Sequence, residues 1–286
     1  MRYGIVMANL QEYANPRVAV RLAQVAEEAS WEGFFVWDHL GFVWGAPSSD
    51  PWVTLSAVAV STTHLRLGTA LTPLARRRPQ IVANAVASLD LLSGGRVVFG
   101  VGLGGSAEEF TAFGEPGGAK ERARVLDEGL TVVDGLWSGG PLTHHGPHYD
   151  VENVSLAPLP LQRPRIPIWI GGESAPALRR AARWDGWLAP ATSPDGTPIM
   201  AKDPERIAEM VAEIQRHRTA DTPFEVAVDG YSEPDDPTLP RAYEAAGATW
   251  WLESIHSMRG PLEEMMARID AGPPDKGGED ARDSRR

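Results

Sequence analysis

The sequence predicts a single (β/α)8 barrel, also called a TIM barrel, with a hairpin or loop inserted before its fifth strand. Short apolar runs alternate with longer segments of helical periodicity through most of the chain. The short runs are apolar without a break, as expected for parallel strands that are covered on both faces. Eight such runs can be counted, which is the number that this closed parallel barrel requires.

The first half of the chain supplies four strands and four helices. Residues 79–92 illustrate the helices, because apolar side chains recur there at helical spacing and Gly94 and Gly95 follow as a stop. Residues 120–137 form a longer amphipathic helix by the same criterion. The other helices are expected at 18–29 and 52–60, and the strands at 3–7, 33–37, 65–71 and 97–99.

Residues 138–167 interrupt this alternation. The segment is rich in proline, glycine and histidine, which indicates the inserted hairpin or long loop. The barrel domain is expected to span residues 1–270, and the tail at 271–286 is expected to be disordered because it has almost no apolar side chains. Beyond the insertion the expected strands are 168–170, 187–189, 224–228 and 249–252, and the helices 175–184, 204–218, 240–246 and 261–269.

Composition narrows the class of protein. The formal net charge is −11 over 286 residues, without a basic stripe or tail, so we expect no nucleic-acid partner and no anionic membrane partner. The chain has no cysteine, which excludes disulfides, thiolate metal sites and cysteine nucleophiles. No secretion signal is visible, and no apolar run approaches the ~20 residues that a membrane span needs. We therefore expect a cytoplasmic enzyme or binding protein.

Candidate site residues gather where strands end. Ligands of parallel α/β folds bind at the carboxyl ends of the strands, and Gly100, Gly102, Gly104 and Gly105 lie at such an end. These glycines predict a small-molecule site, in which we expect a flat ring to lie against the backbone. Asp38 and His39 end the second strand, where a histidine can donate or accept a proton near neutral pH. We expect both to be catalytic residues.

The same glycines allow a different interpretation. Gly100, Gly102 and Gly105 match the dinucleotide fingerprint G-x-G-x-x-G, so an NAD-dependent dehydrogenase remains an alternative. The fingerprint normally follows the first strand and is accompanied by an acidic residue about 20 residues further on. Here it follows the fourth strand, and that acidic residue is missing. The glycines could also serve only to let the chain turn.

A second strand end suggests a phosphate site. Gly171, Gly172, Glu173 and Ser174 lead from a strand into a helix, and free backbone N–H groups at such a turn bind phosphate. The alternative is that Ser174 only caps the helix. Arg122, early in the preceding helix, could add a charge-assisted hydrogen bond.

Two further clusters receive simpler interpretations. The basic run at 75–78 is expected to be a solvated loop before a helix rather than a phosphate contact. His144, His145 and His148 could suggest a metal site. Gly146 and Pro147 prevent their presentation on one helix face, so we expect surface histidines of a hairpin and no metal.

Taken in order, these motifs resemble the bacterial luciferase-like flavin-dependent oxidoreductases, a (β/α)8 family. Asp38 and His39 resemble its acidic–histidine pair, and GTALTPL at 68–74 its third strand. SLDLLSGGRVVFGVGLGG followed by EEFTAFG matches its most recognisable block. KERARVLDEGLTVVDGLW matches its fourth helix, and GGESA its phosphate turn. The resemblance covers residues 1–190 and fades after Asp195.

The resemblance implies a non-covalent cofactor across the barrel mouth, with His39 near its reactive ring. Ala70 and Leu71 would form a non-prolyl cis bulge behind that ring. The residues that would bind the cofactor are Ala70, Leu71, Gly102, Leu103, Gly104, Arg122, Gly171, Gly172, Glu173 and Ser174.

The family uses two cofactors. Reduced FMN activates oxygen for monooxygenation of a small organic substrate and needs a partner flavin reductase, whereas coenzyme F420 transfers a hydride. The strand end Trp37-Asp38-His39 resembles the F420-dependent members and favours F420, although the loop GLGGSAEE departs from the loop common in several of them. The resemblance also implies a homodimer. A non-catalytic member of the fold remains an alternative.

Overall fold

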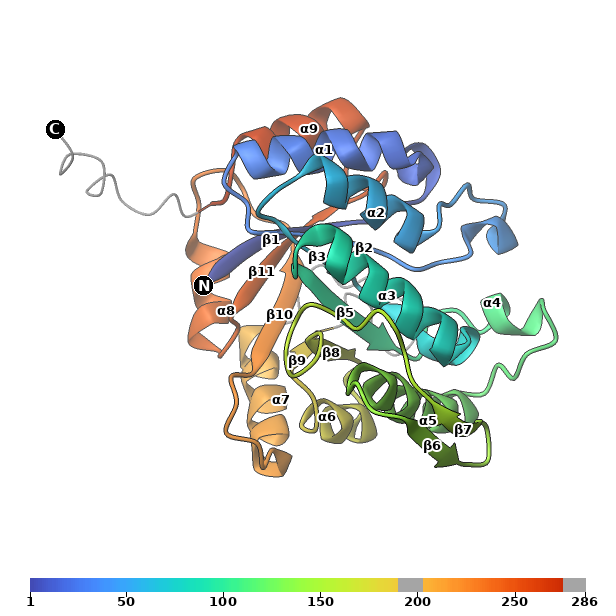
Figure 1. The fold of residues 1–286 in the computed structure, drawn as a ribbon. Helices are drawn as coiled ribbons and strands as arrows, with labels where there is room; N and C mark the ends of the chain where they lie inside the picture. The colour runs from blue at the N-terminus through green and yellow to red at the C-terminus, as the bar shows by residue number, and fades with distance from the viewer. Residues whose placement is uncertain (190–202, 275–286) are drawn as a thin grey trace, which may run out of the picture.

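Parallel strands close into a barrel that is surrounded by helices (Figure 1). The computed structural model describes residues 1–189 and 203–274. The sheet order is β3-β2-β1-β11-β10-β9-β8-β5-β4, and β3 pairs with β5 as well as with β2, which closes the ring. The barrel strands are β1 (Arg2–Met7), β2 (Gly33–Val36), β3 (Arg66–Thr69), β4 (Thr72–Pro73), β5 (Val97–Gly102), β8 (Ile168–Gly171), β9 (Gly186–Leu188), β10 (Glu225–Gly230) and β11 (Trp250–Ile255).

The third barrel position is occupied by two short strands rather than one. β3 ends at Thr69, β4 resumes at Thr72, and the Ala70–Leu71 peptide between them is cis. A single strand at 65–71 was expected, so the strand boundary was wrong, whereas the cis peptide lies where the resemblance placed it. Counting β3 and β4 as one position gives eight, and the predicted (β/α)8 class is confirmed.

Helices alternate with the strands and cover the outside of the barrel. Several begin with proline just inside the first turn, where the missing N–H costs nothing. Asp50 caps α2 by accepting hydrogen bonds from two backbone amides, and Gly94 ends α3 in the left-handed conformation at φ 70°. The helices are α1 (Pro16–Glu28), α2 (Pro51–Ser61), α3 (Pro79–Ser93), α4 (Glu108–Thr111), α5 (Ala119–Trp137), α6 (Ala175–Ala181), α7 (Pro204–His217), α8 (Thr238–Ala245) and α9 (Leu262–Asp270), with short 3-10 turns η1 (Gln11–Ala14), η2 (Gly41–Trp44) and η3 (Leu74–Arg76).

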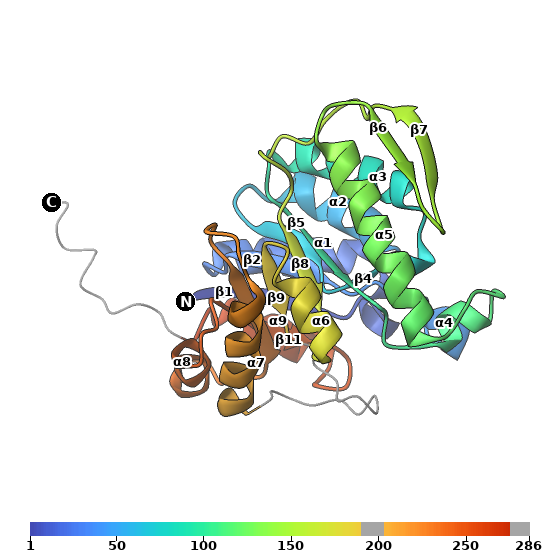
Figure 2. The same ribbon diagram turned by 90° about the horizontal axis from the view of Figure 1, so that it is seen from below.

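Between α5 and β8 the chain forms an antiparallel pair, β6 (Leu142–His145) and β7 (Asp150–Val154). Figure 2 shows this pair outside the barrel, beside α3 and α5. Its side chains are largely exposed, so the pair adds little to the core.

The core has two layers. A large layer lies between the strands and the helices, and a smaller one fills the barrel interior. Phe35 stacks on Trp169 with 5.5 Å between the ring centroids, and Trp169 meets Trp250 edge-on at 5.8 Å. These rings fill the barrel below its carboxyl end, as in other packed barrels whose ligands bind at that end.

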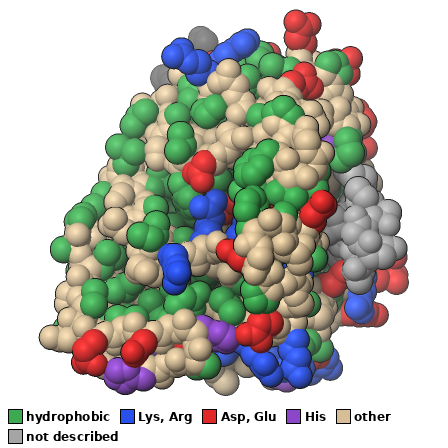
Figure 3. Space-filling model, turned by 90° about the vertical axis from the view of Figure 1, so that its right-hand side faces the viewer, with side chains coloured by type: hydrophobic (Ala, Val, Ile, Leu, Met, Phe, Trp, Pro, Cys, Tyr) green, Lys and Arg blue, Asp and Glu red, His purple; other side chains and the backbone are tan. Residues whose placement is uncertain are grey.

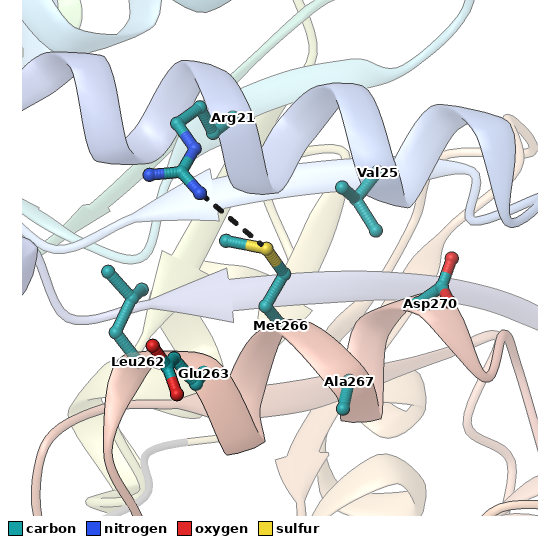
Figure 4. A pocket seen from close by; sticks show the side chains of 7 residues that line it. All are labelled: Arg21, Val25, Leu262, Glu263, Met266, Ala267 and Asp270. Carbon is teal, nitrogen blue, oxygen red and sulfur yellow. Dashed lines mark hydrogen bonds between the residues drawn. The ribbon is translucent and has the colours of Figure 1, made fainter.

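The C-terminal end of the domain differs from the prediction. Residues 271–274 were assigned to a disordered tail, but Gly272 and the two prolines after it are buried, and Arg268 donates a hydrogen bond to the Gly272 carbonyl. The remainder of that predicted tail, 275–286, lies outside the described residues. Nearby, α1 and α9 run side by side and leave a shallow groove in which Arg21 contacts the Met266 sulfur at 4.0 Å (Figure 4).

In the ranges 1–189 and 203–274, no helix is both long enough and apolar enough to cross a bilayer.

Candidate active site

A cavity of about 590 Å³ opens at the carboxyl ends of the barrel strands. Figure 3 shows the hollowed surface on the side of the molecule toward which β5 points, where hydrophobic and charged side chains lie together. The cavity brings together all of the catalytic and cofactor-binding residues predicted from the sequence except Glu173. The predicted residues in its wall are Asp38, His39, Ala70, Leu71, Gly102, Leu103, Gly104, Arg122, Gly171, Gly172 and Ser174.

His39 lies just beyond β2, and its ring is fixed on several sides. Its Nδ1 lies 2.5 Å from Glu109 Oε1, and the ring packs between Trp37 and Trp44 at centroid distances of 5.5 and 5.3 Å. The other carboxylate oxygen of Glu109 accepts a hydrogen bond of 2.8 Å from the Leu40 amide. The Glu109 side chain is 1% exposed and that of His39 is 24% exposed. Glu109 therefore fixes the orientation of the imidazole at Nδ1, and the ring reaches the cavity.

Glu109 belongs to a buried network of ion pairs that the sequence did not reveal. Arg76 donates hydrogen bonds to Glu109 and, at 2.9 Å, to the Asp38 carboxylate. Arg77 binds both Asp38 oxygens at 2.7 and 2.8 Å. The expectation of a solvated basic loop was wrong for these two arginines, because the loop after β4 folds inward to neutralise two buried carboxylates.

Burial raises the pKa of the Glu109 carboxyl, but the hydrogen bond from His39 and the charge of Arg76 outweigh this effect. The pKa of Glu109 therefore lies below its ordinary value. An ionised carboxylate is thus held against the Nδ1 atom of His39 at neutral pH.

Asp38 lies in the cavity wall but not against His39, and the catalytic role expected for it stays a prediction. Its side chain is buried and both carboxylate oxygens accept hydrogen bonds from arginines. Asp38 therefore positions Arg76 and Arg77, while the carboxylate that contacts His39 is Glu109. The signal that could have pointed to Glu109 is its place in GSAEEF, directly after the glycine-rich end of β5.

Arg122 holds the glycine-rich loop. Its Nη1 donates to the carbonyls of Leu103 and Gly104, each at 3.0 Å, and its guanidinium lies 4.7 Å from the Phe110 ring centroid. The Nε atom is buried without a hydrogen-bond partner. Burial lowers the pKa of the Arg122 guanidinium, and the charge of Glu109 opposes this shift. Arg122 thus lines the cavity with a guanidinium that carries a positive charge next to the glycine-rich loop.

The glycines of the site are of two kinds: some are required for close packing, and one borders open space. A Cβ at Gly100 would overlap the Thr69 carbonyl, and a Cβ at Gly171 would overlap the Leu71 side chain, so these two glycines are required for packing. At Gly105 the nearest atom to such a Cβ would be Cε1 of His39, at 4.0 Å. An open space therefore lies between the backbone at Gly105 and the imidazole of His39.

The dinucleotide-binding interpretation fails on the fold. The glycines of the fingerprint end β5, which lies inside a closed barrel rather than opening a doubly wound sheet. Gly100 is explained by its approach to Thr69, and no NAD site is needed to account for it.

The turn from β8 into α6 lies on the same wall. The Ser174 side chain accepts a hydrogen bond from the Ala177 amide, as expected of an N-cap, and it also lines the cavity. Trp187 fixes the turn by donating to the Gly172 carbonyl at 2.8 Å. Glu173 lines a separate groove between α6 and α7 instead, and the cofactor contact expected for it stays a prediction.

The histidines of the β6–β7 pair lie elsewhere and contact acidic residues individually. His144 lies 3.2 Å from Glu128, and His145 lies 2.5 Å from Asp150. No cluster of three or more metal-binding side chains occurs in the part of the chain that the structure describes.

Fold and site together define a barrel protein in which an imidazole, paired with a buried carboxylate, faces a cavity at the barrel mouth. A family profile described as luciferase-like monooxygenase matches residues 1–258. The chain belongs to this family, which confirms the resemblance drawn from its motifs.

Individual relatives differ in the cofactor that their names give. The chain is 32% identical to an F420-dependent glucose-6-phosphate dehydrogenase of Microbacterium testaceum over 73% of this chain and 60% of the relative. It is 33% identical to an FMNH(2)-dependent dimethylsulfone monooxygenase of Pseudomonas putida over 64% of this chain and 52% of the relative. The chain thus spans less than two thirds of the length of the curated relatives it matches.

Solved structures support the fold. The coenzyme F420-dependent tetrahydromethanopterin reductase of Methanopyrus kandleri superposes with a TM-score of 0.75 at 18% identity, over 94% of this chain and 96% of that one. An F420-dependent secondary alcohol dehydrogenase superposes with a TM-score of 0.79, also at 18% identity, over 97% and 99% of the two chains.

Proposed function

We propose that this protein is an oxidoreductase that uses coenzyme F420 to transfer a hydride to or from a small organic substrate. The observation that carries the proposal is the pair of His39 and the buried Glu109, in which His39 faces a cavity large enough for a ring and a small substrate. When bound, F420 would supply the hydride transfer, and the protein would supply orientation and proton management. F420-dependent relatives in the same family support this choice.

The cavity residues fit such a cofactor. The backbone at Gly105 leaves open space next to His39, and Gly102 and Gly104 line the same cavity, in which a flat ring would lie. The cis peptide of Ala70 and Leu71 borders the same space. Arg122 and the turn at Gly171, Gly172 and Ser174 would hold the phosphate through N–H and hydroxyl donors.

His39 would donate a proton to the substrate or accept one from it. Because Glu109 occupies Nδ1, the ring nitrogen that exchanges a proton with the substrate is Nε2. The carboxylate of Glu109 stabilises the protonated imidazole, and Arg76 in turn holds that carboxylate in place. Trp37 and Trp44 fix the plane of the ring and narrow the access of water.

Reduced FMN is the second candidate, because a named FMNH(2)-dependent monooxygenase is also a relative. With FMN the protein would consume oxygen and would need a flavin reductase as its partner. Titration of the purified protein with F420 and with FMN, followed by fluorescence, separates the two reactions. Binding of F420 supports hydride transfer, binding of FMN alone supports monooxygenation, and binding of neither refutes both in favour of a non-catalytic member of the family.

The outer face of α2 and α3 supports a homodimer. α2 contains no charged residue, and the one charged residue of α3, Asp90, is buried. The two helices pack against each other, and Val53, Val60 and Ile81 on their outer surfaces are each more than 60% exposed. An exposed apolar face of this kind suits a two-fold contact with a second copy of the chain.

A further inference from the structure

The cavity is bounded by two contiguous arcs of the barrel. The arc of β4, β5 and β8 contributes mainly backbone and small residues, including Gly102 and Gly171. The arc of β2, β1, β11 and β10 contributes side chains, among them Trp37, Leu252 and Asp229. A flat ring that lies on the first arc would leave the second arc to contact the substrate.

Asp229 is a carboxylate on the second arc, and its direction follows from the strand. Side chains alternate along β10, and Ala227 belongs to the apolar cluster inside the barrel. Asp229, two residues further on, therefore also faces the interior, and it lines the cavity while being only 7% exposed. On the neighbouring strand, the Ser254 hydroxyl donates to its Oδ2 at 3.3 Å.

The surroundings of Asp229 define what it can recognise. Leu252 lies opposite Asp229 on the neighbouring strand, and the same cavity is lined by Val6 and by the rings of Trp37 and Trp44. An ionised carboxylate only accepts hydrogen bonds, and it can accept from more than one donor at once. A hydrogen bond to a carboxylate is stronger where water is largely excluded than at the surface, so a ligand that provides a donor gains more here.

We propose that Asp229 determines substrate specificity by accepting a hydrogen bond from a hydroxyl or amino group on an otherwise apolar, ring-sized substrate. The role toward a substrate rests on the proposed function, whereas recognition of the donor can be tested separately. The chemistry excludes anionic groups from this end of the cavity, because a carboxylate of the substrate would be repelled by Asp229.

The test uses three probes of similar shape: benzyl alcohol, benzylamine and toluene. Their dissociation constants are measured by ligand-observed NMR on the protein with and without F420. We expect the alcohol or the amine to bind about tenfold or more tightly than toluene, as for a hydrogen bond to a charged group. Asp229→Leu should abolish this preference. Asp150→Asn, at a highly exposed carboxylate of the β6–β7 pair, should leave it unchanged.

The proposal is overturned if neither donor binds, if toluene binds as tightly as both donors, or if the preference survives in Asp229→Leu. Should that variant fail to fold, Asp229→Asn replaces it, since it keeps the shape and removes the charge. The preference for benzylamine should then fall about tenfold, and an unchanged preference overturns the proposal. If F420 and FMN both fail to bind but the preference still depends on Asp229, the proposed function fails and the recognition stands.

Discussion

The buried carboxylate of Glu109 should stabilise the protein in a manner that depends on pH. Glu109→Gln keeps the shape of the side chain and removes the charge that faces Arg76 and His39. The Glu109 side chain is 1% exposed, so solvent screens these interactions little. Breaking a buried ion pair costs about 3–5 kcal/mol, and the retained amide hydrogen bonds reduce the expected loss to about 2–3 kcal/mol at pH 7.

The sign of the pH dependence follows from the pKa of Glu109, which is lower in the folded protein than its ordinary value of 4.5. The unfolded chain therefore binds the proton more readily, and the stabilisation is fully present above pH 4.5. It is lost as the pH falls through the folded pKa, so the difference between wild type and variant should shrink in acid.

Urea unfolding followed by tryptophan fluorescence measures this difference at pH 7 and at a series of lower pH values. Glu152→Gln is the matched control, because its side chain on β7 is 73% exposed and its contact with His145 is a surface pair. The control should change stability by less than about 1 kcal/mol. A Gln variant as stable as wild type at pH 7, or a difference that does not shrink in acid, would refute the role given to this network.

Three further predictions concern the site and the assembly. His39→Ala should reduce F420 turnover with an alcohol substrate by about 10²-fold because proton transfer is lost, and should leave the cofactor dissociation constant unchanged because the phosphate contacts remain; equal turnover removes His39 from the mechanism. Arg122→Ala should weaken cofactor binding by about 1.5–3 kcal/mol in a fluorescence titration, and an unaltered dissociation constant argues against the phosphate contact. Val60→Glu should convert a dimer into a species of the protomer mass of 31.0 kDa by light scattering, whereas Val154→Glu on β7 should not. A wild-type protein that is already monomeric contradicts the proposed interface.

The fold could be predicted from the sequence because the patterns that indicate strands and helices are local and recur along the chain. Apolar runs and helical periodicity place strands and helices independently of one another, and their alternation then leaves few arrangements. The break between β3 and β4 was placed only by the resemblance, because no local propensity distinguishes Ala70 and Leu71 from the rest of a strand. The end of the domain was misplaced because proline and glycine at 272–274 resemble a linker by composition while the structure buries them.

The site was predicted in part for the same reason. Strand ends could be located, so His39, the glycine-rich loop and the turn at Ser174 were found. Glu109 and Arg76 were missed because their partners are distant in sequence, and pairing of charges across three loops leaves no periodic signal. Asp229 was missed because an acidic residue in an apolar strand becomes informative only when the inner face of the strand is known.

The position of the buried ion pairs along the chain bears on how the substrate of such a barrel can change between relatives. Every residue of the ion network, from Asp38 to Glu109, lies in the first half of the barrel, and the loops after β2, β4 and β5 are tied together by it. The carboxylate proposed to recognise the substrate lies on β10, in the other half, outside this network. The second half of the barrel could thus be exchanged between relatives to alter the accepted substrate, while the pair proposed to move a proton, His39 and Glu109, stays intact.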